Sequence, residues 1–326
     1  MIEISNSEDF FRYQKQLKVI PFTQSEAWYA MAVAKGATAR FFVDAKTNTS
    51  IAIWGVESKV PLFNSIIFRV SGEARTAELD EKTIQAFYNT LASLFKAIEI
   101  DSNTKYNVEM EVGLRRAGYK RPIGVFSCPL TLVNDLVKEQ QIRSRSWKRN
   151  VKIAQKANLV VKEVGNPDNT HINDFVALFQ EMSKTKEMTH VVSYEEISSL
   201  LAHNSIRLYA IATPKNEVLA YRIVQVHNDY AYDIFAANSN KSRNYRGATY
   251  LLVEQLFKSL KEEGVRYFDF GRIPPSNHST DKIYEFKIGA RGEKVQYNGE
   301  WANYKSLTTE ILVFFYKYFK LKKQRY

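Results

Sequence analysis

The sequence predicts a mixed α/β fold made of two domains of one kind, with mixed, mostly antiparallel sheets flanked by helices. Amphipathic helical segments alternate with short β-branched and aromatic segments along the chain. The order helix, glycine, strand occurs twice, around Gly118 and around Gly264, as expected of a duplicated unit. Three strand-like segments follow one another at 206–237, which is typical of a meander. We therefore expect an N-terminal domain at 1–135 and a C-terminal domain at 136–326.

The N-terminal domain is expected to contain four helices and four strands. Ser25 is placed to cap a helix that runs to residue 34, because its hydroxyl can accept a hydrogen bond from the first turn. The segment 80–98 carries its apolar residues on one side and predicts an amphipathic helix. The other expected elements are helices at 9–17 and 108–117 and strands at 40–44, 50–57, 63–70 and 123–130.

In the C-terminal domain, residues 244–301 carry most of the functional prediction. A basic turn at 245–248 precedes a helix that stops at Gly264, and a strand over 265–270 follows. A loop with Pro274 and Pro275 leads to residues 284–287, expected in a strand, and a strand pair is expected to turn at Asn298-Gly299. The other expected elements are helices at 170–184, 194–202 and 307–319 and strands at 206–213, 218–227 and 230–237.

Composition limits the classes of protein that fit this chain. Its 326 residues carry a formal net charge of +11, so the surface should attract polyanions such as RNA, nucleotide-sugar phosphates or anionic lipids, or simply keep the protein dissolved. No apolar run reaches the ~18–20 residues of a membrane span, and the polar N-terminal segment does not resemble a signal peptide. The single cysteine, Cys128, excludes an intramolecular disulfide and is expected as a buried strand thiol.

Residues 143–162 form the most basic part of the chain, with seven lysines and arginines and no acid. Lys148, Lys152 and Lys156 recur every four residues and therefore share one stripe of a predicted helix. Like charges at this spacing repel one another mildly. The stripe is either a surface that binds phosphate, from RNA, pyrophosphate or membrane, or a solvated helix face.

The turn at 245–248 opens a helix, and the N-terminus of a helix presents unpaired backbone N–H groups. Such groups attract phosphate or a developing negative charge, and the strand after the helix can deliver side chains to the same place. This arrangement suits a transferase that holds a phosphorylated substrate. An ordinary crossover between two strands would have the same pattern.

Three groups of residues carry a family resemblance. The largest consists of Gly247-Ala248, Leu251-Leu252, Gly264, Tyr267-x-Asp269-Phe270-Gly271, Tyr284-x-Phe286-Lys287-x-Gly289 and Gly299-x-Trp301. The others are Pro21-Phe22-x-Gln24-Ser25-x-x-Trp28 and the basic segment with Arg149, Asn150 and Lys152. Together they span most of the chain and resemble the Fem-type peptidoglycan-bridge aminoacyltransferases, relatives of the GNAT acetyltransferases.

The resemblance implies two tandem GNAT-like domains and transfer of an aminoacyl or acyl group to an amine of a cell-envelope precursor, either of peptidoglycan or of a surface polysaccharide. It implies that Lys287 stabilises the oxyanion and that Phe286 shapes the site. It also implies that the segment Gln24, Ser25 and Trp28 borders an acceptor groove between the domains, although Trp28 would serve equally well in core packing.

Acyl transfer to an amine requires a polarised carbonyl, a neutral amine, a stabilised leaving group and a dry site. The sequence has no Gly-x-Ser-x-Gly segment, and its five histidines lack His-x-x-x-His spacing, so we expect direct attack by the amine and no metal. The expected catalytic residues are Lys287, Phe286 and Asp269, the last orienting the amine or Lys287 or merely capping a loop. The expected substrate-binding residues are Gln24, Ser25, Trp28, Arg149, Asn150, Tyr232, Asp233, Arg243, Arg246, Gly247, Ala248, Arg272 and Tyr284.

The donor remains open between aminoacyl-tRNA and acyl-coenzyme A, and no tightly bound cofactor is expected. Residues 243–248 keep the ends of the coenzyme A loop pattern Arg/Gln-x-x-Gly-x-Gly/Ala, but Arg246 replaces its first glycine. Arg243, Arg246 and Arg272 can clamp phosphates through paired N–H donors. Fem-type enzymes use aminoacyl-tRNA, and the long helical arm of that family is missing here.

Two other functions stay open: an acyl-coenzyme A-dependent N-acyltransferase on an amino sugar or lipid, and a non-catalytic RNA- or membrane-binding protein on a transferase fold. The expected partner is a phosphorylated or lipid-linked envelope precursor, with tRNA as a further candidate. The helix at 307–319 is very apolar and is followed by lysines, so it contacts either a membrane or its own domain. We expect a cytoplasmic protein, at the inner face of the cell membrane if that helix contacts lipid.

Overall fold

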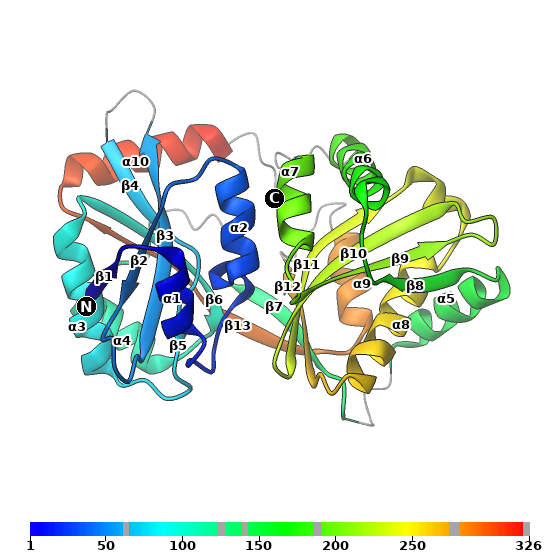
Figure 1. The fold of residues 1–326 in the computed structure, drawn as a ribbon, viewed down its shortest axis with the longest axis horizontal. Coiled ribbons are helices and arrows are strands. Elements are labelled where there is room, and N and C mark those ends of the chain that lie inside the picture. Colours follow the sequence, from blue (N-terminus) through cyan, green and yellow to red (C-terminus); the bar gives the residue numbers. More distant parts are fainter. Residues whose placement is uncertain (61–64, 123–127, 139–142, 186–190, 274–280, 322–326) are drawn as a thin grey trace. The chain divides into compact units, whose positions relative to one another are not determined.

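The computed structural model describes residues 1–60, 65–122, 128–138, 143–185, 191–273 and 281–321 (Figure 1). The chain forms two compact units. Unit 1 comprises Met1–Pro129 and Val295–Arg325, and unit 2 comprises Leu130–Lys294. We expected the segment from 295 onwards in the C-terminal domain. It groups with unit 1 because its strand pairs with a strand of that unit.

Unit 1 contains a sheet with the strand order β1-β2-β3-β4-β6-β13, and β5 pairs with β3. Its neighbouring strands are antiparallel except for β4 and β6, which are parallel over Phe68 to Val70 and Ile98 to Ile100. The strands are β1 (Ile2–Ile4), β2 (Ala39–Val43), β3 (Ile51–Val60), β4 (Ser65–Val70), β5 (Ala74–Arg75), β6 (Ala97–Lys105) and β13 (Glu293–Tyr304).

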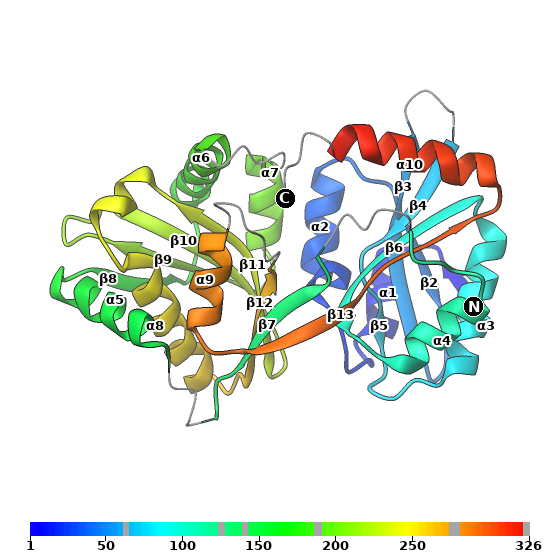
Figure 2. The ribbon, with the colours of Figure 1, turned by 180° about the vertical axis from the view of Figure 1, so that it is seen from behind.

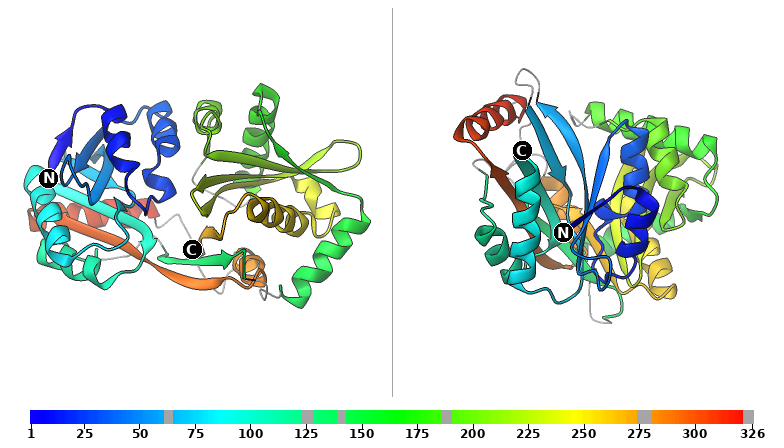
Figure 3. Two further views of the ribbon diagram at one scale, coloured as in Figure 1. Left: turned by 60° about the horizontal axis from the view of Figure 1, so that its bottom comes forward. Right: turned by 60° about the vertical axis from the view of Figure 1, so that its left-hand side comes forward.

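Helices cover both faces of the unit 1 sheet, because successive side chains of a strand point to opposite faces. Phe41 and Val43 pack with α1 and α2, whereas Phe42 packs with α3 and α4. Figure 3 shows helices on both faces of this sheet. Ser25 caps α2 by accepting a hydrogen bond from the Trp28 backbone N–H at 3.2 Å, which confirms the predicted cap. The helices are α1 (Ser7–Gln14), η1 (Phe22–Gln24), α2 (Glu26–Ala34), α3 (Glu81–Leu94), α4 (Val108–Arg116) and α10 (Leu307–Leu321).

Unit 2 contains a sheet with the strand order β7-β12-β11-β10-β9-β8. The predicted meander is confirmed as β9, β10 and β11, and only the pair β11 and β12 is parallel among the described pairs. The strands are β7 (Leu130–Asp135), β8 (Val160–Val164), β9 (Ile206–Ala212), β10 (Val218–His227), β11 (Tyr230–Asn238) and β12 (Tyr267–Arg272).

The helices of unit 2 lie on both faces of its sheet. Figure 2 shows α5, α8 and α9 on one face, and α6 and α7 lie on the other. Trp147 of α5 and Leu252 and Leu256 of α8 form the centre of the core on the first face, together with Phe268 of β12. The helices are α5 (Arg145–Lys156), α6 (Asn169–Thr185), α7 (Tyr194–Leu201), η2 (Asn240–Asn244), α8 (Ala248–Glu262) and α9 (Asp281–Gly289).

The two units repeat one arrangement, in which a helix joins two strands that are parallel over only three residues each. In unit 1, α3 joins β4 to β6, and in unit 2, α8 joins β11 to β12. In unit 2 the paired residues are Tyr230 to Tyr232 and Tyr267 to Asp269. Within the described residues, β11 and β12 then continue without pairing with each other, so the sheet opens at Tyr232 and Asp269.

Several predicted elements were wrong. The helix expected over 80–98 ends at Leu94, and β6 begins at Ala97. Residues 284–287 belong to helix α9 and not to a strand. Asn298 and Gly299 lie inside the single strand β13, where the positive φ of Gly299 (71°) accompanies a register shift against β6 and makes no turn.

Strand β7 begins at Leu130, the last residue of the strand expected over 123–130. Residues 123–127 lie outside the described residues, as does the loop with Pro274 and Pro275. Cys128 is half-buried and lies outside any strand.

Candidate active site in unit 2

The candidate site lies where β11 and β12 separate. The pairing of β10 with β11 shifts register there, since Ile223 faces Phe235 while Val224 faces Asp233. The skipped residue, Ile234, therefore forms a bulge on β11, and bulges re-aim neighbouring side chains. The opening of the sheet and the bulge together place Asp233, Asp269 and Gly271 close to one another, with the Gly271 Cα position facing the Asp233 carbonyl.

Lys287 reaches this opening from α9. Its Nζ donates hydrogen bonds to the Phe270 carbonyl at 2.5 Å and to the Arg272 carbonyl at 3.3 Å, two acceptors on β12. Burial lowers the pKa of Lys287 to about 8, and Arg222 acts in the same direction, against the opposing charges of Asp233 and Asp269. The residue as a whole is half-buried. Its ammonium is thus poorly hydrated, and it holds its proton at neutral pH less firmly than an exposed lysine does.

Asp233 and Arg222 form a buried ion pair beside this lysine. Both side chains are 6% exposed, and an Arg222 guanidinium N–H donates to Asp233 Oδ2. The other carboxylate oxygen, Asp233 Oδ1, is buried and has no hydrogen-bond partner among the described residues. A buried carboxylate oxygen without a donor is costly, so this oxygen can accept a hydrogen bond from an N–H group of a ligand.

Asp269 is held in one orientation by three donors. Its Oδ1 accepts hydrogen bonds from the Thr131 hydroxyl at 2.5 Å and the Gly271 N–H at 2.8 Å, and its Oδ2 accepts one from the Tyr230 hydroxyl at 3.3 Å. Asp269 is 1% exposed. Burial, reinforced by Asp269, raises the pKa of Tyr232, the residue that faces Asp269 across the strand pair. Tyr232 therefore keeps its phenolic proton at neutral pH.

Phe286 anchors the helix that carries Lys287. Its ring stacks on Trp147 with 5.2 Å between centroids and lies edge-on to Tyr250 at 4.9 Å. The Trp147 indole N–H in turn donates to Glu254 at 2.8 Å, which fixes the indole plane. The end of α9 is tied to α5 by the Ser144 N–H, which donates to the Gly289 carbonyl at 2.9 Å. Packing on α5 and α8 therefore fixes the position of Lys287.

A second group of predicted residues meets at the start of α8. Gly247 precedes the helix with φ of 91°, and a Cβ at this position would lie 2.1 Å from the Asn150 carbonyl oxygen. The Arg246 Nε donates to Asn150 Oδ1 at 3.2 Å. Glycine is required here for both its positive φ and its close approach to α5. Asn150, Arg246, Gly247 and Ala248 thus form one small region at the N-terminus of a 15-residue helix.

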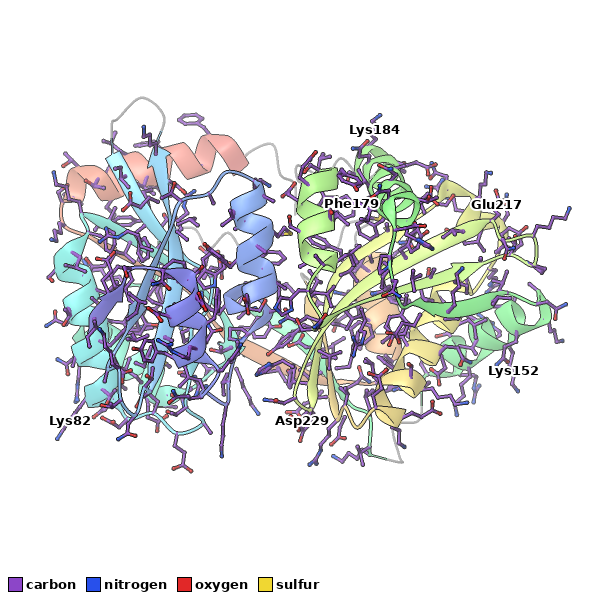
Figure 4. The ribbon with its side chains drawn as sticks, in the orientation of Figure 1. Lys82, Lys152, Phe179, Lys184, Glu217 and Asp229 are labelled. Carbon is purple, nitrogen blue, oxygen red and sulfur yellow. The ribbon has the colours of Figure 1, made fainter. Side chains whose placement is uncertain are left out.

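The predicted basic residues differ in their exposure. Arg149, Arg243 and Arg246 are exposed, and Arg272 is half-buried. The lysine stripe of α5 is exposed as expected, with Lys152 on the outer side of the helix (Figure 4). Trp147, Val151 and Ala154 are buried on its inner face. Tyr284 is half-buried and packs against the core of unit 2.

The predicted residues Gln24, Ser25 and Trp28 belong to unit 1. The contacts of Gln24 and Trp28 lie within that unit. Gln24 is fully buried, and its amide N–H groups donate to the Trp54 and Ser71 carbonyls, both at 3.0 Å. Its Oε1 accepts a hydrogen bond from the Trp54 N–H at 2.8 Å. Trp28 is half-buried against Phe22, with 5.1 Å between ring centroids. A substrate contact by these residues stays a prediction.

Sequence reasoning missed Arg222, Thr131 and Glu254. A signal for Arg222 was present, because an arginine in the middle of an apolar strand needs a buried partner. Asp233 lies on the next strand of the meander, so it was an available partner for Arg222. Thr131 and Glu254 carry no such local signal, since their partners Asp269 and Trp147 are far away in the sequence.

Neither a metal site nor a membrane span emerges from the part of the chain that the structure describes. Within that part, no three His, Cys, Asp or Glu side chains gather closely enough to hold a metal ion. The described helices include none that is both long and apolar enough to cross a bilayer.

Comparisons with known proteins agree with this fold. Residues 145–287 match the family model of the acetyltransferase (GNAT) domain. The fold is similar to that of FemX, with a TM-score of 0.78 and 14% identity over 96% of this chain and 100% of the other. It is also similar to L-PGS from Bacillus licheniformis, with a TM-score of 0.65 and 14% identity over 94% and 96% of the two chains.

A tandem GNAT protein from the clavulanic acid biosynthesis pathway has a TM-score of 0.52 and 11% identity, over 90% of this chain and 92% of the other. A search of curated proteins found no match to the sequence. The predicted fold class, with two tandem GNAT-like domains, is confirmed, and the resemblance to Fem-type proteins holds for the fold.

Proposed function

We infer that this chain, an acyltransferase with a GNAT domain over residues 145–287, transfers an aminoacyl or acyl group to an amine of a cell-envelope precursor. The observation that carries the proposal is the state of Lys287. A half-buried ammonium with a pKa near 8, at an opening of the sheet, is suited to stabilise an oxyanion. Chemistry at a carbonyl needs such a preorganised positive charge.

We propose direct attack by the acceptor amine on the donor carbonyl, without a covalent enzyme intermediate. The amine nitrogen forms the new bond to the carbonyl carbon, and the electron pair of the C=O bond moves to the oxygen beside Lys287. Asp233 Oδ1 accepts the amine proton, because it is buried and has no other donor among the described residues. The electron pair on the oxygen then re-forms the C=O bond, and the bond to the leaving oxygen or sulfur breaks. The leaving group keeps the electron pair of that bond and takes the proton that Asp233 accepted, so Asp233 returns to its carboxylate form.

Asp269 and Tyr232 are proposed to position the reacting groups. The three donors that hold Asp269 leave it little freedom to move, so it keeps β12 and Tyr230 in place. The neutral phenol of Tyr232 can donate a hydrogen bond to the acceptor. Phe286 is proposed to hold Lys287 through its stack on Trp147 and does not itself meet the carbonyl.

The donor is proposed to place its phosphates at the start of α8. Backbone N–H groups there, together with Arg246 and the neighbouring Arg243, suit a pyrophosphate or an RNA phosphate. The GNAT match favours an acyl-coenzyme A donor. The similarity to the fold of FemX supports an aminoacyl-tRNA donor as the alternative. The exposed lysine stripe of α5 would extend the contact if the donor is RNA.

The acceptor is proposed to be a phosphorylated or lipid-linked precursor with a free amine, handled in the cytoplasm near the inner face of the membrane. A lipid acceptor is the second candidate, because the fold is also similar to the C-terminal domain of a putative lysylphosphatidylglycerol synthetase from Agrobacterium fabrum. That structure has a TM-score of 0.62 and 13% identity over 95% of this chain and 96% of the other.

A donor test decides between these possibilities. The protein is incubated with either charged tRNA or acyl-coenzyme A and a pool of envelope precursors, and new amides are detected by mass spectrometry. A product that is lost after RNase treatment selects the tRNA donor, and a product formed with acyl-coenzyme A selects the other. Lys287→Ala is the matched control and should form little product. Failure of both donors, with tight RNA or vesicle binding, would support a non-catalytic protein.

A further inference from the structure

Helix α10 carries an apolar stripe that faces outward. Leu307, Ile311, Phe315, Tyr318 and Phe319 are 71%, 44%, 49%, 48% and 65% exposed. These positions recur at intervals of three and four residues, so they lie along one side of the helix. A stripe of large apolar side chains on one helix face marks an interaction surface.

The opposite side of α10 holds the helix on unit 1. Val313 is 2% exposed and packs with Ile67 and Ala97, with Tyr304 beside them. The sequence left open whether this helix docks on its own domain or meets a membrane. One side does dock on unit 1, whereas the stripe is exposed.

A hollow beside α10 extends this surface. Its volume is about 140 Å³, and it is lined by Pro122, Tyr304, Leu307, Glu310, Ile311, Val313 and Phe314. Leu307 and Ile311 belong to both the hollow and the stripe. The apolar surface therefore continues from the helix into a recess of unit 1.

We propose that the stripe of α10 inserts into the surface of a membrane that contains anionic lipids. Aromatic and aliphatic side chains next to lysines are typical of helices that lie in a lipid interface. The sequence continues from the stripe with Lys320, Lys322, Lys323 and Arg325, and the whole chain carries a net charge of +11. Basic residues beside an apolar face are attracted to an anionic leaflet.

A second copy of the chain fits the stripe less well. The five side chains are about half exposed, and a large side chain buries about 200 Å², so the stripe offers roughly 500 Å². A stable protein interface needs about 800 Å² from each partner. Lipid requires no such area from a complementary surface, because insertion of a few side chains and the attraction of basic residues add together.

Vesicle co-sedimentation of the full chain tests the proposal. Vesicles of phosphatidylcholine mixed with phosphatidylglycerol should bind the protein, and pure phosphatidylcholine or high salt should weaken binding. The double variant Phe315→Ser/Phe319→Ser should lower binding by about tenfold, since both rings are lost from the interface. Leu94→Ser is the matched control, because Leu94 is also about half exposed in unit 1, at 49%, and should leave binding unchanged.

Three results would overturn the proposal: absence of binding to the anionic vesicles at low salt, equal binding by the double variant, or a dimer that only the double variant disrupts. The proposal rests on the exposed apolar stripe of α10 and on the basic residues of the chain, and it does not depend on chemistry at Lys287. With a soluble acceptor the double variant should keep its rate of amide formation. Vesicle binding without any amide formation would therefore contradict the proposed reaction, but the proposed binding of α10 to lipid would stand.

Discussion

Units 1 and 2 contain the same short parallel strand pair joined by a helix, but they bury charge beside it in different ways. In unit 1, Glu73 is completely buried and accepts a hydrogen bond from Thr104, and burial raises the pKa of Glu73 against the effect of Arg75. In unit 2, Lys287 is only half-buried at the opening between β11 and β12. The lower burial of Lys287 distinguishes unit 2, for which the chemistry is proposed.

The neighbouring polar side chains follow the same division. Thr23 and Gln24 donate hydrogen bonds to the Ser71 carbonyl in unit 1, so they hold its backbone together just after β4. The equivalent place in unit 2 lies after Tyr232, where Asp233 keeps one carboxylate oxygen without a partner among the described residues. In the repeated arrangement, the polar side chains of unit 1 thus support the backbone, whereas those of unit 2 are proposed to take part in the reaction.

Breaking the Arg222–Asp233 pair should have the largest effect. Arg222→Leu leaves a buried carboxylate without its partner, which costs about 3–5 kcal/mol in the free energy of unfolding. Urea unfolding measures this cost. The double variant Arg222→Leu/Asp233→Leu should recover much of the stability and yet stay inactive, because the proposed proton acceptor is gone. Equal stability of the single and double variants would contradict this account.

Loss of the Lys287 charge should follow in size. Lys287→Ala is expected to lower the rate of amide formation by about 10²–10³, the typical cost of losing one stabilising donor at an oxyanion. Glu73→Gln in unit 1 is the matched comparison and should leave the rate nearly unchanged. Thermal unfolding separates chemistry from folding, because Lys287 also binds two carbonyls of β12. A rate loss no greater than the loss of folded protein would make Lys287 a structural residue.

Gly247→Ala should cost less, through a steric clash. The new Cβ would lie 2.1 Å from the Asn150 carbonyl, and such crowding typically costs about 1–3 kcal/mol. The Gly247→Ala variant should also bind coenzyme A more weakly, as measured by isothermal titration calorimetry. Gly264→Ala is the control, since Gly264 has a similar φ of 88° but no neighbour within 4 Å of its added Cβ. Similar losses in the two variants would show that backbone strain alone is responsible.

The dependence on pH should be the smallest and the most specific effect. The pKa of Lys287 is about 8, so the rate should fall about tenfold per pH unit above that value as the ammonium loses its proton. Lys287→Arg should remove this fall, because arginine stays charged. Stability should change in the opposite direction between pH 8 and 10.5, because there the unfolded chain binds more protons than the folded one. A rate that is flat across this range would contradict a role for the charged lysine.

Much of the fold was predictable because local signals agreed with it. Ser25 and Ser193 cap helices as serine does in many proteins, and the glycines at 118 and 264 end helices with positive φ. The misses were also local in origin. The pattern of Asn298-Gly299 indicates a turn, but its context is a long strand, in which the glycine accommodates a bulge.

Some residues of the candidate site were predictable from the sequence, but their geometry was not. Lys287, Asp269 and Asp233 do come together, although α9 presents Lys287 where a strand was expected. The pairing of Asp233 with Arg222 depends on the register of a hairpin, which the sequence pattern does not determine. The closeness of Gly247 to Asn150 depends on how α5 and α8 pack, and this too is a tertiary property.

The stack of Phe286 on Trp147 has a consequence for the position of Lys287. Trp147 lies on the helix whose Asn150 meets the start of α8, while Phe286 precedes Lys287 in the chain. The stacked rings of Trp147 and Phe286 therefore connect two parts of unit 2. One is the start of α8, where a donor's phosphates are proposed to bind, and the other is the Lys287 ammonium, which is proposed to face the donor's carbonyl. The position of Lys287 therefore depends on the packing of α5 as well as on its own helix.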